Sequence, residues 1–367
     1  MAAPEQRNSV DRPLLLAVVA IHVLAIARPV DVLFPVDPWS VGRMLLHGQI
    51  PYRDFQFEYP PLSAVAFLLP GLVPHGVAPT VLALQALGME LLAVVFIRGQ
   101  AGALRRYAAL SFLLFPFLAG GFDAFPMAAL AVSTALLAAG NPAGWAVVAA
   151  GAMMKISPGL AWAWCRDHLV QAGAALVVTL AVVLAPLALA RHRDDDWLSY
   201  NVHRGVQVES VAATTTWLAH QVTGRSSTFA YRFKAYEIDH ASGAAVAWVG
   251  AGALAMLWIA ARAKGRSAWV LALLAVDVFL VSSKVLSPQY LAWTAPLAAV
   301  VGGRTFRLHL AMAALTVVAY SVVSGREAIL VVSALRNVIL VATVALGLWG
   351  LRGPVTAPAE DALSPPA

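Results

Sequence analysis

Residues 143–164 read AGWAVVAAGAMMKISPGLAWAW, and this stretch decides how the rest of the chain is arranged. It is long enough to cross a bilayer, because a spanning helix needs about 20 mostly apolar residues. Near its middle, however, stand the charge of Lys155 and the helix-breaking Pro158. We therefore expect two short helices that turn at Lys155, so that this stretch enters and leaves a membrane on the same side.

The composition of the whole chain is that of a membrane protein. Hydrophobic residues make up 60% of the 367 residues and charged residues only 12%, whereas soluble domains carry about 25% charged residues. This excludes a soluble enzyme, a nucleic-acid-binding domain and a disordered scaffold. The net charge of +6 is then typical of arginine in cytoplasmic loops, not of a nucleic-acid partner. Since Cys165 is the single cysteine, an internal disulfide and a thiolate zinc site are excluded as well.

Apolar stretches suited to membrane-spanning helices occur along most of the chain. They cover residues 13–30, 78–97, 107–120, 124–140, 169–190, 243–261, 267–283, 288–301, 308–323 and 328–350. Residues 61–73 are too short and contain Pro70 and Gly71, so we expect them not to cross. The pattern predicts an all-α polytopic integral membrane protein with about 10–12 transmembrane helices or half-helices. We expect these to form a single domain over residues 1–352.

Basic residues indicate which connections face the cytoplasm, where arginine and lysine gather. They cluster at Arg7, Arg12, Arg98, Arg105, Arg106, Arg166, Arg262, Lys264, Arg266, Arg304, Arg307 and Arg352. These clusters lie on one side of the membrane only if residues 143–164 form the two short helices that turn at Lys155. Residues 31–75 and 191–242 then become two long extracytoplasmic loops of a multi-pass plasma-membrane protein. Residues 353–367 are rich in Pro and Ala, which predicts a disordered cytoplasmic tail.

The first outer loop combines acids with aromatic residues. Its acids are Asp31, Asp37, Asp54 and Glu58, and its aromatics are Trp39, Tyr52, Phe55, Phe57 and Tyr59. Apolar positions within residues 39–46 share one helical face, which predicts a short interfacial helix. Acids at an apolar boundary can serve as general bases. The competing interpretation is a solvated loop whose aromatics lie at the level of the lipid headgroups.

Two charges fall inside or between apolar spans. Asp123 lies in a turn of a few residues, where it either caps the next helix or lines a polar site at membrane depth. Lys155 either binds a phosphate at the mouth of the hairpin or extends its ammonium to the surface. Glu90 and Asp277 lie within predicted spans, and we expect both to be buried and paired.

The second outer loop and the segment near Lys284 carry further polar residues. Lys284 lies at the outer end of its predicted helix, where extension of the side chain to the surface is the simpler interpretation. The loop holds Arg204, Gln207 and Glu209. It also contains three consecutive aspartates, at 194–196, which fit either a divalent metal or a hydrated start of the loop.

Four stretches, taken in order, resemble the motifs of GT-C glycosyltransferases. Residues 48–62, GQIPYRDFQFEYPPL, are similar to the G-x-x-P-Y-x-D-x-x-x-E-Y-P-P-L stretch of glycosyltransferase family 87, the polyprenol-phosphate-mannose-dependent mannosyltransferases. Residues 121–123 resemble its G-x-F-D turn, and residues 155–158 its K-x-x-P. Residues 287–293, SPQYLAW, resemble its S-P-Q-Y-L-x-W. Together the similarity extends from Asp31 to about Trp293.

The resemblance implies a GT-C-like fold and a hexosyltransferase activity. A sugar, mannose or a pentose, would move with inversion from a polyprenyl-phosphate donor to a lipid or glycan acceptor on the outer face. The base in this family is an aspartate near the start of the first outer loop, followed by a tyrosine. Asp37 is the best match and Asp31 the rival, because Trp39 stands near the place of that tyrosine.

The remaining roles follow from the same resemblance. Cations would stabilise the leaving phosphate, namely Lys155, Lys284 and Arg204. Polar side chains would orient sugar hydroxyls, namely Asp123, Glu58, Gln207 and Gln289. Aromatic rings would stack on the sugar or line a prenyl groove, namely Tyr52, Tyr59 and Trp39. The donor lipid is the one cofactor-like molecule implied, and the need for a divalent metal stays open.

Two other functions fit the same residues. Broken helices and intramembrane charges are also found at transport sites, so a transporter or lipid flippase is an alternative. A catalytically degenerate member of the family that binds a lipid-linked sugar is another. Asp37, Asp123 and Lys155 around one outward cavity would favour transfer, whereas a path of charges through to the cytoplasm would favour transport.

Overall fold

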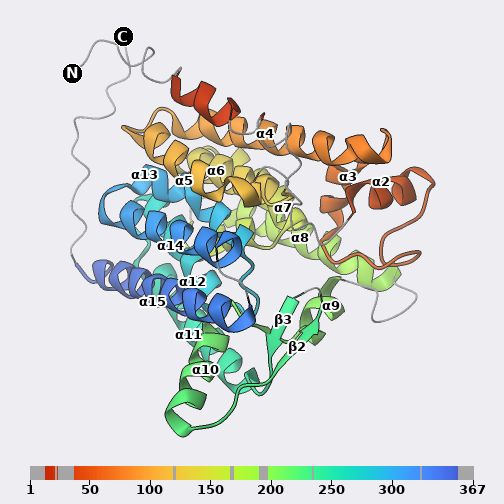
Figure 1. Ribbon diagram of the computed structural model, residues 1–367. Coiled ribbons are helices and arrows are strands. Elements are labelled where there is room, and N and C mark those ends of the chain that lie inside the picture. Colours follow the sequence, from red (N-terminus) through yellow and green to blue (C-terminus); the bar gives the residue numbers. More distant parts are fainter. Residues whose placement is uncertain are drawn as a thin grey trace.

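The structure, a computed structural model, describes residues 13–20, 23, 37–118, 121–165, 169–189, 197–233, 235–322 and 325–353. It is mainly helical (Figure 1). The longer helices are α4 (Ala78–Ile97), α5 (Ala103–Leu118), α6 (Ala124–Ala138), α7 (Ala143–Met154), α8 (Leu169–Leu189), α11 (Ser242–Arg262), α12 (Ala268–Ser282), α14 (Gly303–Ser321) and α15 (Arg326–Gly350). Their bounds lie close to those of the predicted spans, and the bounds of α4 coincide with them. Of the first predicted span, residues 13–30, residues 13–20 and 23 are described and the other half is not.

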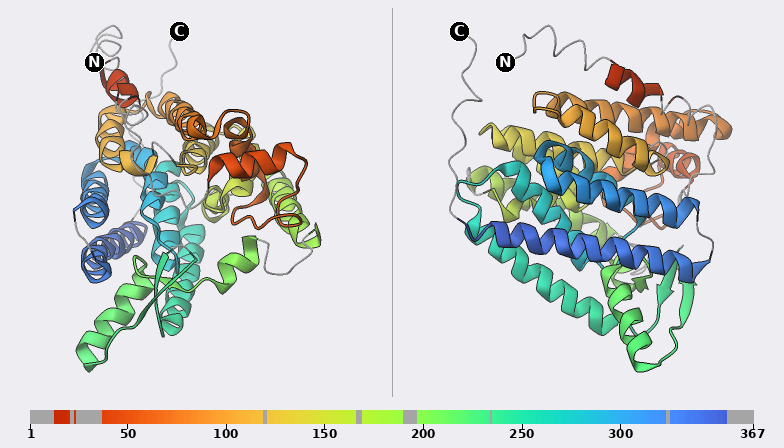
Figure 2. Two further views of the ribbon diagram at one scale, coloured as in Figure 1. Left: turned by 45° about the vertical axis from the view of Figure 1, so that its right-hand side comes forward. Right: turned by 60° about the vertical axis from the view of Figure 1, so that its left-hand side comes forward.

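The lengths and apolar compositions of several helices are compatible with a location in a membrane. In the described part of the chain, three helical segments are long and apolar enough to cross a bilayer: His75–Ile97, Ser242–Arg262 and Arg326–Gly350. Apolar sequence favours helix in a bilayer because a helix satisfies its own backbone hydrogen bonds. The helices form a bundle of roughly parallel rods, in which α11, α14 and α15 lie side by side (Figure 2, right).

The structure confirms the break at Lys155. Helix α7 ends at Met154, and Lys155 has an extended backbone with φ −161° and ψ 140°. The chain continues in a 3₁₀ helix, η3 (Ser157–Ala163), with Pro158 in its first turn. Residues 288–301, which we predicted as one span, are divided in a similar way. They form the 3₁₀ helix η4 (Pro288–Thr294) followed by the short α13 (Ala295–Val301).

The segment of residues 31–75, which we name the first outer loop after its predicted location, contains a helix where a short interfacial helix was predicted. It is α2 (Pro38–Leu46), and it packs on the short helix α3 (Val65–Gly71), which follows the 3₁₀ turn η1 (Pro61–Ala64). The two backbones touch at glycines, since a Cβ on Gly42 would lie 2.6 Å from Gly71 Cα and 2.2 Å from the carbonyl oxygen of Phe67. Both helices lie at the end of the bundle opposite the C-terminal end of α15 (Figure 1).

The second long loop is folded, which the sequence did not lead us to expect. Its elements are α9 (Trp197–His203), β1 (Val206–Gln207), α10 (Val211–Thr223), β2 (Phe229–Arg232) and β3 (Ala235–Ile238). The strands form an antiparallel sheet in the order β1-β3-β2, with Gln207 opposite Glu237 and Tyr231 opposite Tyr236. The loop projects from the side of the bundle (Figure 2, left).

Candidate functional site

The site is built around an ion pair between Asp123 and Lys155. Asp123 precedes α6 but makes no capping hydrogen bond to it. Its Oδ1 instead accepts hydrogen bonds from Lys155 Nζ at 2.7 Å and Trp293 Nε1 at 2.9 Å. The side chains of Lys155 and Asp123 are only 12% and 7% exposed. Burying a charge is costly unless an opposite charge compensates it. Here Asp123 and Lys155 compensate each other.

Three aromatic rings surround the ammonium of Lys155. Its Nζ lies 4.5 Å from the ring centroid of Tyr290, 5.0 Å from that of Trp293 and 5.7 Å from that of Tyr59. Tyr290 and Trp293 stack on each other with centroids 4.3 Å apart. Aromatic faces attract a cation through their quadrupole, most strongly when water is excluded. We call Asp123, Lys155, Tyr59, Tyr290 and Trp293 the lysine cluster.

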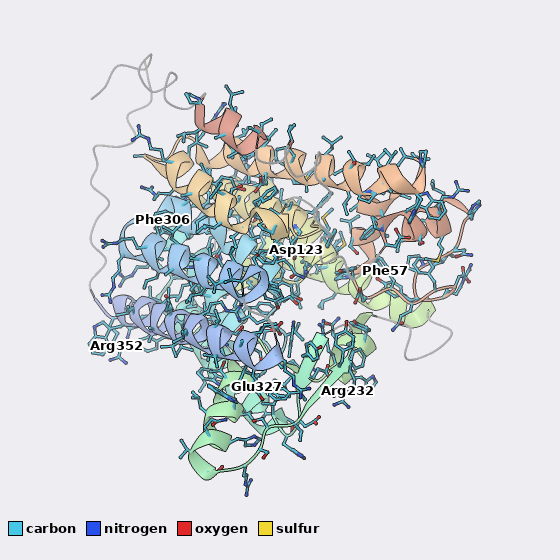
Figure 3. The ribbon with its side chains drawn as sticks, viewed as in Figure 1. Phe57, Asp123, Arg232, Phe306, Glu327 and Arg352 are labelled. Atoms are coloured by element: carbon cyan, nitrogen blue, oxygen red, sulfur yellow. The ribbon has the colours of Figure 1, made fainter. Side chains whose placement is uncertain are left out.

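The lysine cluster unites four segments that are distant in the sequence. Tyr59 comes from the first outer loop, Asp123 from the turn before α6, Lys155 from the break after α7, and the last two aromatics from η4. Each belongs to one of the four stretches on which the family resemblance rests. Figure 3 labels Asp123 inside the bundle and Phe57 toward the end formed by α2 and α3.

Glu58 extends the site toward the second outer loop. Glu58 is half-buried, and its charge acts on the hydroxyl of Tyr200 in α9, which donates to the carbonyl of Phe233 at 3.4 Å. Partial burial and the charge of Glu58 raise the pKa of Tyr200, so this hydroxyl stays protonated and acts as a donor. The negative charge of Glu58 also acts on Lys155 and on Tyr59. Glu58 therefore stands between the lysine cluster and the second outer loop.

The P-Y-x-D part of the first motif forms a tight turn. Tyr52 has a positive φ of 69°, and its N–H donates to the carbonyl of Phe55 at 2.9 Å. Asp54 Oδ2 accepts from the N–H of Ile50 at 2.8 Å. The hydroxyl of Tyr52 donates to the carbonyl of Tyr59 at 2.5 Å, and the residue is 2% exposed. Tyr52 thus holds the backbone next to Glu58 in place and offers no exposed ring face for stacking on a sugar.

Asp37 occupies a different environment from the lysine cluster. It is the N-cap of α2, where Oδ1 accepts from the N–H of Trp39 at 3.0 Å and Oδ2 from Ser40 Oγ at 2.5 Å. His75 Nε2 lies 3.4 Å from Oδ2, and the Asp37 side chain is 42% exposed. Partial burial raises the pKa of Asp37, but the hydrogen bonds from Ser40 and Trp39 and the nearby His75 outweigh it, so the pKa is lowered.

The other predicted base and one neighbour of Asp37 complete that region. Asp31, the rival base, lies outside the described residues. Trp39 is partly buried and donates its Nε1–H to the carbonyl of Val73 at 3.0 Å. None of the hydrogen bonds or ion pairs found for Asp37 within the described ranges reaches a residue of the lysine cluster.

Lys284 fixes the second outer loop. Its Nζ donates to the carbonyls of Val202 at 2.8 Å and Arg204 at 2.5 Å. Partial burial lowers the pKa of Lys284, and the nearby Arg204 acts in the same direction. The ammonium is thereby committed to backbone oxygens, which makes Lys284 the weakest of the three cations predicted to hold a phosphate.

The remaining predicted residues lie along the same boundary. Gln207 is 4% exposed, its N–H donates to the carbonyl of Lys284 at 2.9 Å, and its Oε1 accepts from Ser287 Oγ at 3.4 Å. Nε of Arg204 is buried, and among the described residues it has no hydrogen-bond partner. Gln289 is half-buried on η4, next to Tyr290. These residues line the contact between the second outer loop and η4.

Residues that the sequence analysis missed anchor this loop to the bundle. Arg336 Nη2 and Asn337 Nδ2 both donate to the carbonyl of Glu209, at 2.5 and 3.0 Å. The hydroxyl of Tyr320 donates to the Glu209 carboxylate. Arg336 is 1% exposed although it lies in the middle of α15. An arginine inside an apolar span is a signal in the sequence itself, and it could have identified this anchor.

The two acids within predicted spans, Glu90 and Asp277, are buried and paired, as expected. Glu90 accepts from the hydroxyls of Tyr107 at 2.9 Å and Ser111 at 3.1 Å. Asp277 Oδ1 lies 3.1 Å from Nε2 of His309. Within the described ranges, no three His, Cys, Asp or Glu side chains gather as metal ligands, and the aspartates at 194–196 lie outside those ranges.

Comparisons with known proteins found nothing similar to this chain. No family model, no curated protein and no solved structure matches it.

Proposed function

We propose that this protein is a membrane glycosyltransferase of the GT-C type, resembling glycosyltransferase family 87. It would transfer mannose or a pentose from a polyprenyl-phosphate donor to a lipid or glycan acceptor, on the extracytoplasmic face of the plasma membrane. One observation carries the proposal: the four stretches that resemble the family's motifs meet at the lysine cluster. Unrelated sequence similarities have no reason to converge on one place in the fold.

The chemistry that suits this cluster is an inverting displacement. The acceptor oxygen forms a bond to the anomeric carbon while the bond from that carbon to the phosphate oxygen breaks, through an oxocarbenium-like transition state. The phosphate leaves as an anion, so cations are needed more than a general acid. Arg204, with its buried unpartnered Nε, and Lys155 are the best placed of the predicted cations.

The remaining side chains of the site would hold the sugar and the lipid. Carboxylate and amide groups bind sugar hydroxyls by hydrogen bonds, which suits Asp123, Gln207 and Gln289. Tyr59 and Tyr290 are partly exposed and would contact the sugar. The exposed apolar side chains of α8 and α11, such as Val177 and Leu254, suit lipid contact.

A transporter or flippase remains the second candidate, because the bundle contains buried charges. The arrangement of those charges supports transfer instead. Glu90 and Asp277 are each satisfied by neighbours in their own part of the bundle. Their partners Tyr107, Ser111 and His309 are not members of the lysine cluster. Such closed pairs are poor steps for a charge path.

Purified protein in lipid vesicles with labelled polyprenyl-phosphate mannose tests the proposal. We expect release of polyprenyl phosphate when a mixture of membrane lipids is supplied as acceptor, and loss of release in Asp123→Asn. Glu327→Gln, an exposed carboxylate at the start of α15, is the control and should behave as wild type. Binding of the donor without turnover would favour a non-catalytic lipid-sugar-binding protein. If the protein neither binds nor turns over the mannose and pentose donors, the proposal is contradicted and transport is favoured.

A further inference from the structure

Arg266 joins the end of α11 to the end of α15. This residue lies in the turn between α11 and α12. Its Nη2 donates to the carbonyl of Leu351 at 3.1 Å and to the carbonyl of Gly353, both of which follow the last residue of α15. The last carbonyls of a helix lack partners within the helix, and a basic side chain can satisfy them. The turn after α11 is therefore held against the C-terminal end of α15.

Three further cations gather at this junction. Arg262 is the last residue of α11, Lys264 lies in the turn, and Arg352 follows α15. All three are exposed, and among the described residues none offers their charged groups a hydrogen bond or an ion pair. We call Arg262, Lys264 and Arg352 the basic corner.

The exposed acids of the described residues lie away from the basic corner. They are Asp37 and Asp54 in the first outer loop and Glu327 at the start of α15. Figure 3 labels Glu327 and Arg352 at opposite ends of α15. The first outer loop is also at the far end of the bundle from Arg352 (Figure 1). The positive charge of the basic corner is therefore not neutralised by an exposed acid of the described chain, and it is complementary to an anion.

Each arginine of the basic corner lies over a tryptophan ring. Cζ of Arg262 is 4.5 Å from the ring centroid of Trp258, and Cζ of Arg352 is 4.6 Å from that of Trp349. Stacking holds a guanidinium by its face and leaves the N–H groups in its plane available to phosphate oxygens. Tryptophan is enriched at the level of the lipid headgroups, and Trp349 is 67% exposed. Both arginines are thus held where phospholipid phosphates would lie.

We infer that the basic corner binds the headgroup of an anionic phospholipid. Basic groups between membrane-spanning helices suit such headgroups, because the phosphate and the side chains carry opposite charges. Exposed apolar side chains adjoin the cations, since Leu257 of α11 and Leu346 of α15 precede the corner by less than two helical turns. These side chains suit acyl chains, which a free phosphate does not have. The inference is independent of the proposed transfer reaction.

Lipid binding by the full chain tests this inference. The protein in a neutral detergent is titrated with phosphatidylglycerol or with phosphatidylcholine of the same acyl chains, and native mass spectrometry gives the dissociation constant for each. A basic residue near an anionic lipid surface strengthens association by about fivefold. The triple variant Arg262→Gln, Lys264→Gln and Arg352→Gln should therefore lose about 100-fold in affinity for phosphatidylglycerol. Its affinity for phosphatidylcholine should not change.

The matched control removes three other exposed arginines. It combines Arg105→Gln, Arg304→Gln and Arg307→Gln. Figure 3 labels Phe306, which lies between the last two, at the same end of the bundle as Arg352. The control therefore loses the same charge from the same end of α14 and α15 while keeping the basic corner, and it should bind phosphatidylglycerol as the wild type does.

Three results would overturn the inference. Equal affinity of the wild type for the two lipids would show that the headgroup charge is not recognised. Equal losses in the two triple variants would assign the preference to the overall charge of this end. Displacement of phosphatidylglycerol by inorganic phosphate at an equal concentration would identify a free anion as the ligand. Thermal unfolding is measured for each variant, and if the triple variant unfolds, Arg262→Gln and Arg352→Gln alone should each lose about fivefold in affinity.

Discussion

Single residues in this molecule are exceptional because their charges lie where water is scarce. Lys155 and Asp123 neutralise each other, and Trp293 supplies a second donor to the same carboxylate oxygen. Removing one member of a buried pair costs more than removing both, because a charge is then left without its partner. Together with Trp293, the pair therefore links the start of α6, the break after α7 and η4.

Replacement of Lys155 tests this view at the residue scale. Lys155→Met should lower the free energy of unfolding by about 3–5 kcal/mol, since it leaves the Asp123 carboxylate buried. The double variant Lys155→Met with Asp123→Leu should recover part of that loss. Thermal unfolding in detergent gives both numbers and the coupling between them. With Asp123→Leu alone measured as well, a loss in the double variant equal to the sum of the two single losses would show that the two charges do not depend on each other.

The sequence revealed some of these residues and concealed others, for physical reasons. Asp123 and Lys155 were found because a charge among apolar residues is conspicuous. Glu58 and Tyr59 were found within a motif. Tyr200 gave no such signal, because a tyrosine in a polar loop is ordinary until its partner is known. Glu58 and Asp37 lie in different environments because of the geometry of the loop. The local sequence around each acid does not predict that geometry.

At the scale of elements, the contact between α2 and α3 depends on the absence of side chains. Gly42 and Gly71 let the two backbones approach until an added Cβ would overlap main-chain atoms. Backbone atoms cannot move aside as a flexible side chain can. The closeness of these helices in turn positions the segment between them, which carries Tyr52, Glu58 and Tyr59.

Alanine substitutions measure the importance of that contact. Gly42→Ala and Gly71→Ala should each destabilise the protein by about 1–3 kcal/mol through overpacking. Gly88→Ala is the matched control, because nothing lies near its Cβ position in α4 and alanine favours a helix by about 0.5–1 kcal/mol. Thermal unfolding compares the three variants. A Gly42→Ala protein as stable as Gly88→Ala would mean that the helices separate easily.

The lengths of the apolar stretches predicted the bounds of most helices. They did not predict the elements that are too short, or too interrupted, to form a long apolar stretch. The helices α4, α8 and α11 follow directly from apolar runs. The sheet of the second outer loop has strands of two to four residues, too short for an alternating pattern to emerge. The division of residues 288–301 into η4 and α13 was also missed, because Pro288 and Pro296 are each compatible with a helix's first turn.

At the scale of the whole molecule, sidedness is the property on which the proposed reaction depends. Ser226 and Lys264 are both exposed and lie beyond opposite ends of α11. If α11 crosses a membrane, the two must face different compartments. The arginine pattern predicts that Ser226 faces outward and Lys264 faces the cytoplasm.

Cysteine labelling can establish this arrangement. With the buried Cys165 replaced by alanine, Ser226→Cys should react with an impermeant maleimide in sealed right-side-out vesicles. Lys264→Cys should react only after the vesicles are permeabilised. The opposite pattern would place the lysine cluster's neighbouring loop in the cytoplasm and remove the basis for an extracytoplasmic reaction. Labelling of both positions in detergent serves as the control for reactivity.

The anchoring of Glu209 by α15 has a consequence for how the chain is made. Arg336 and Asn337 follow every segment of the lysine cluster along the sequence, so they leave the ribosome after all of them. Until these two residues are synthesised, the carbonyl of Glu209 lacks two of its hydrogen-bond donors, and the second outer loop lacks this anchor. A nascent chain interrupted before α15 would thus contain every motif and yet expose an unfinished polar surface within the bundle. Among the described helices, α15 is therefore the one whose arrival completes the hydrogen bonding of this loop.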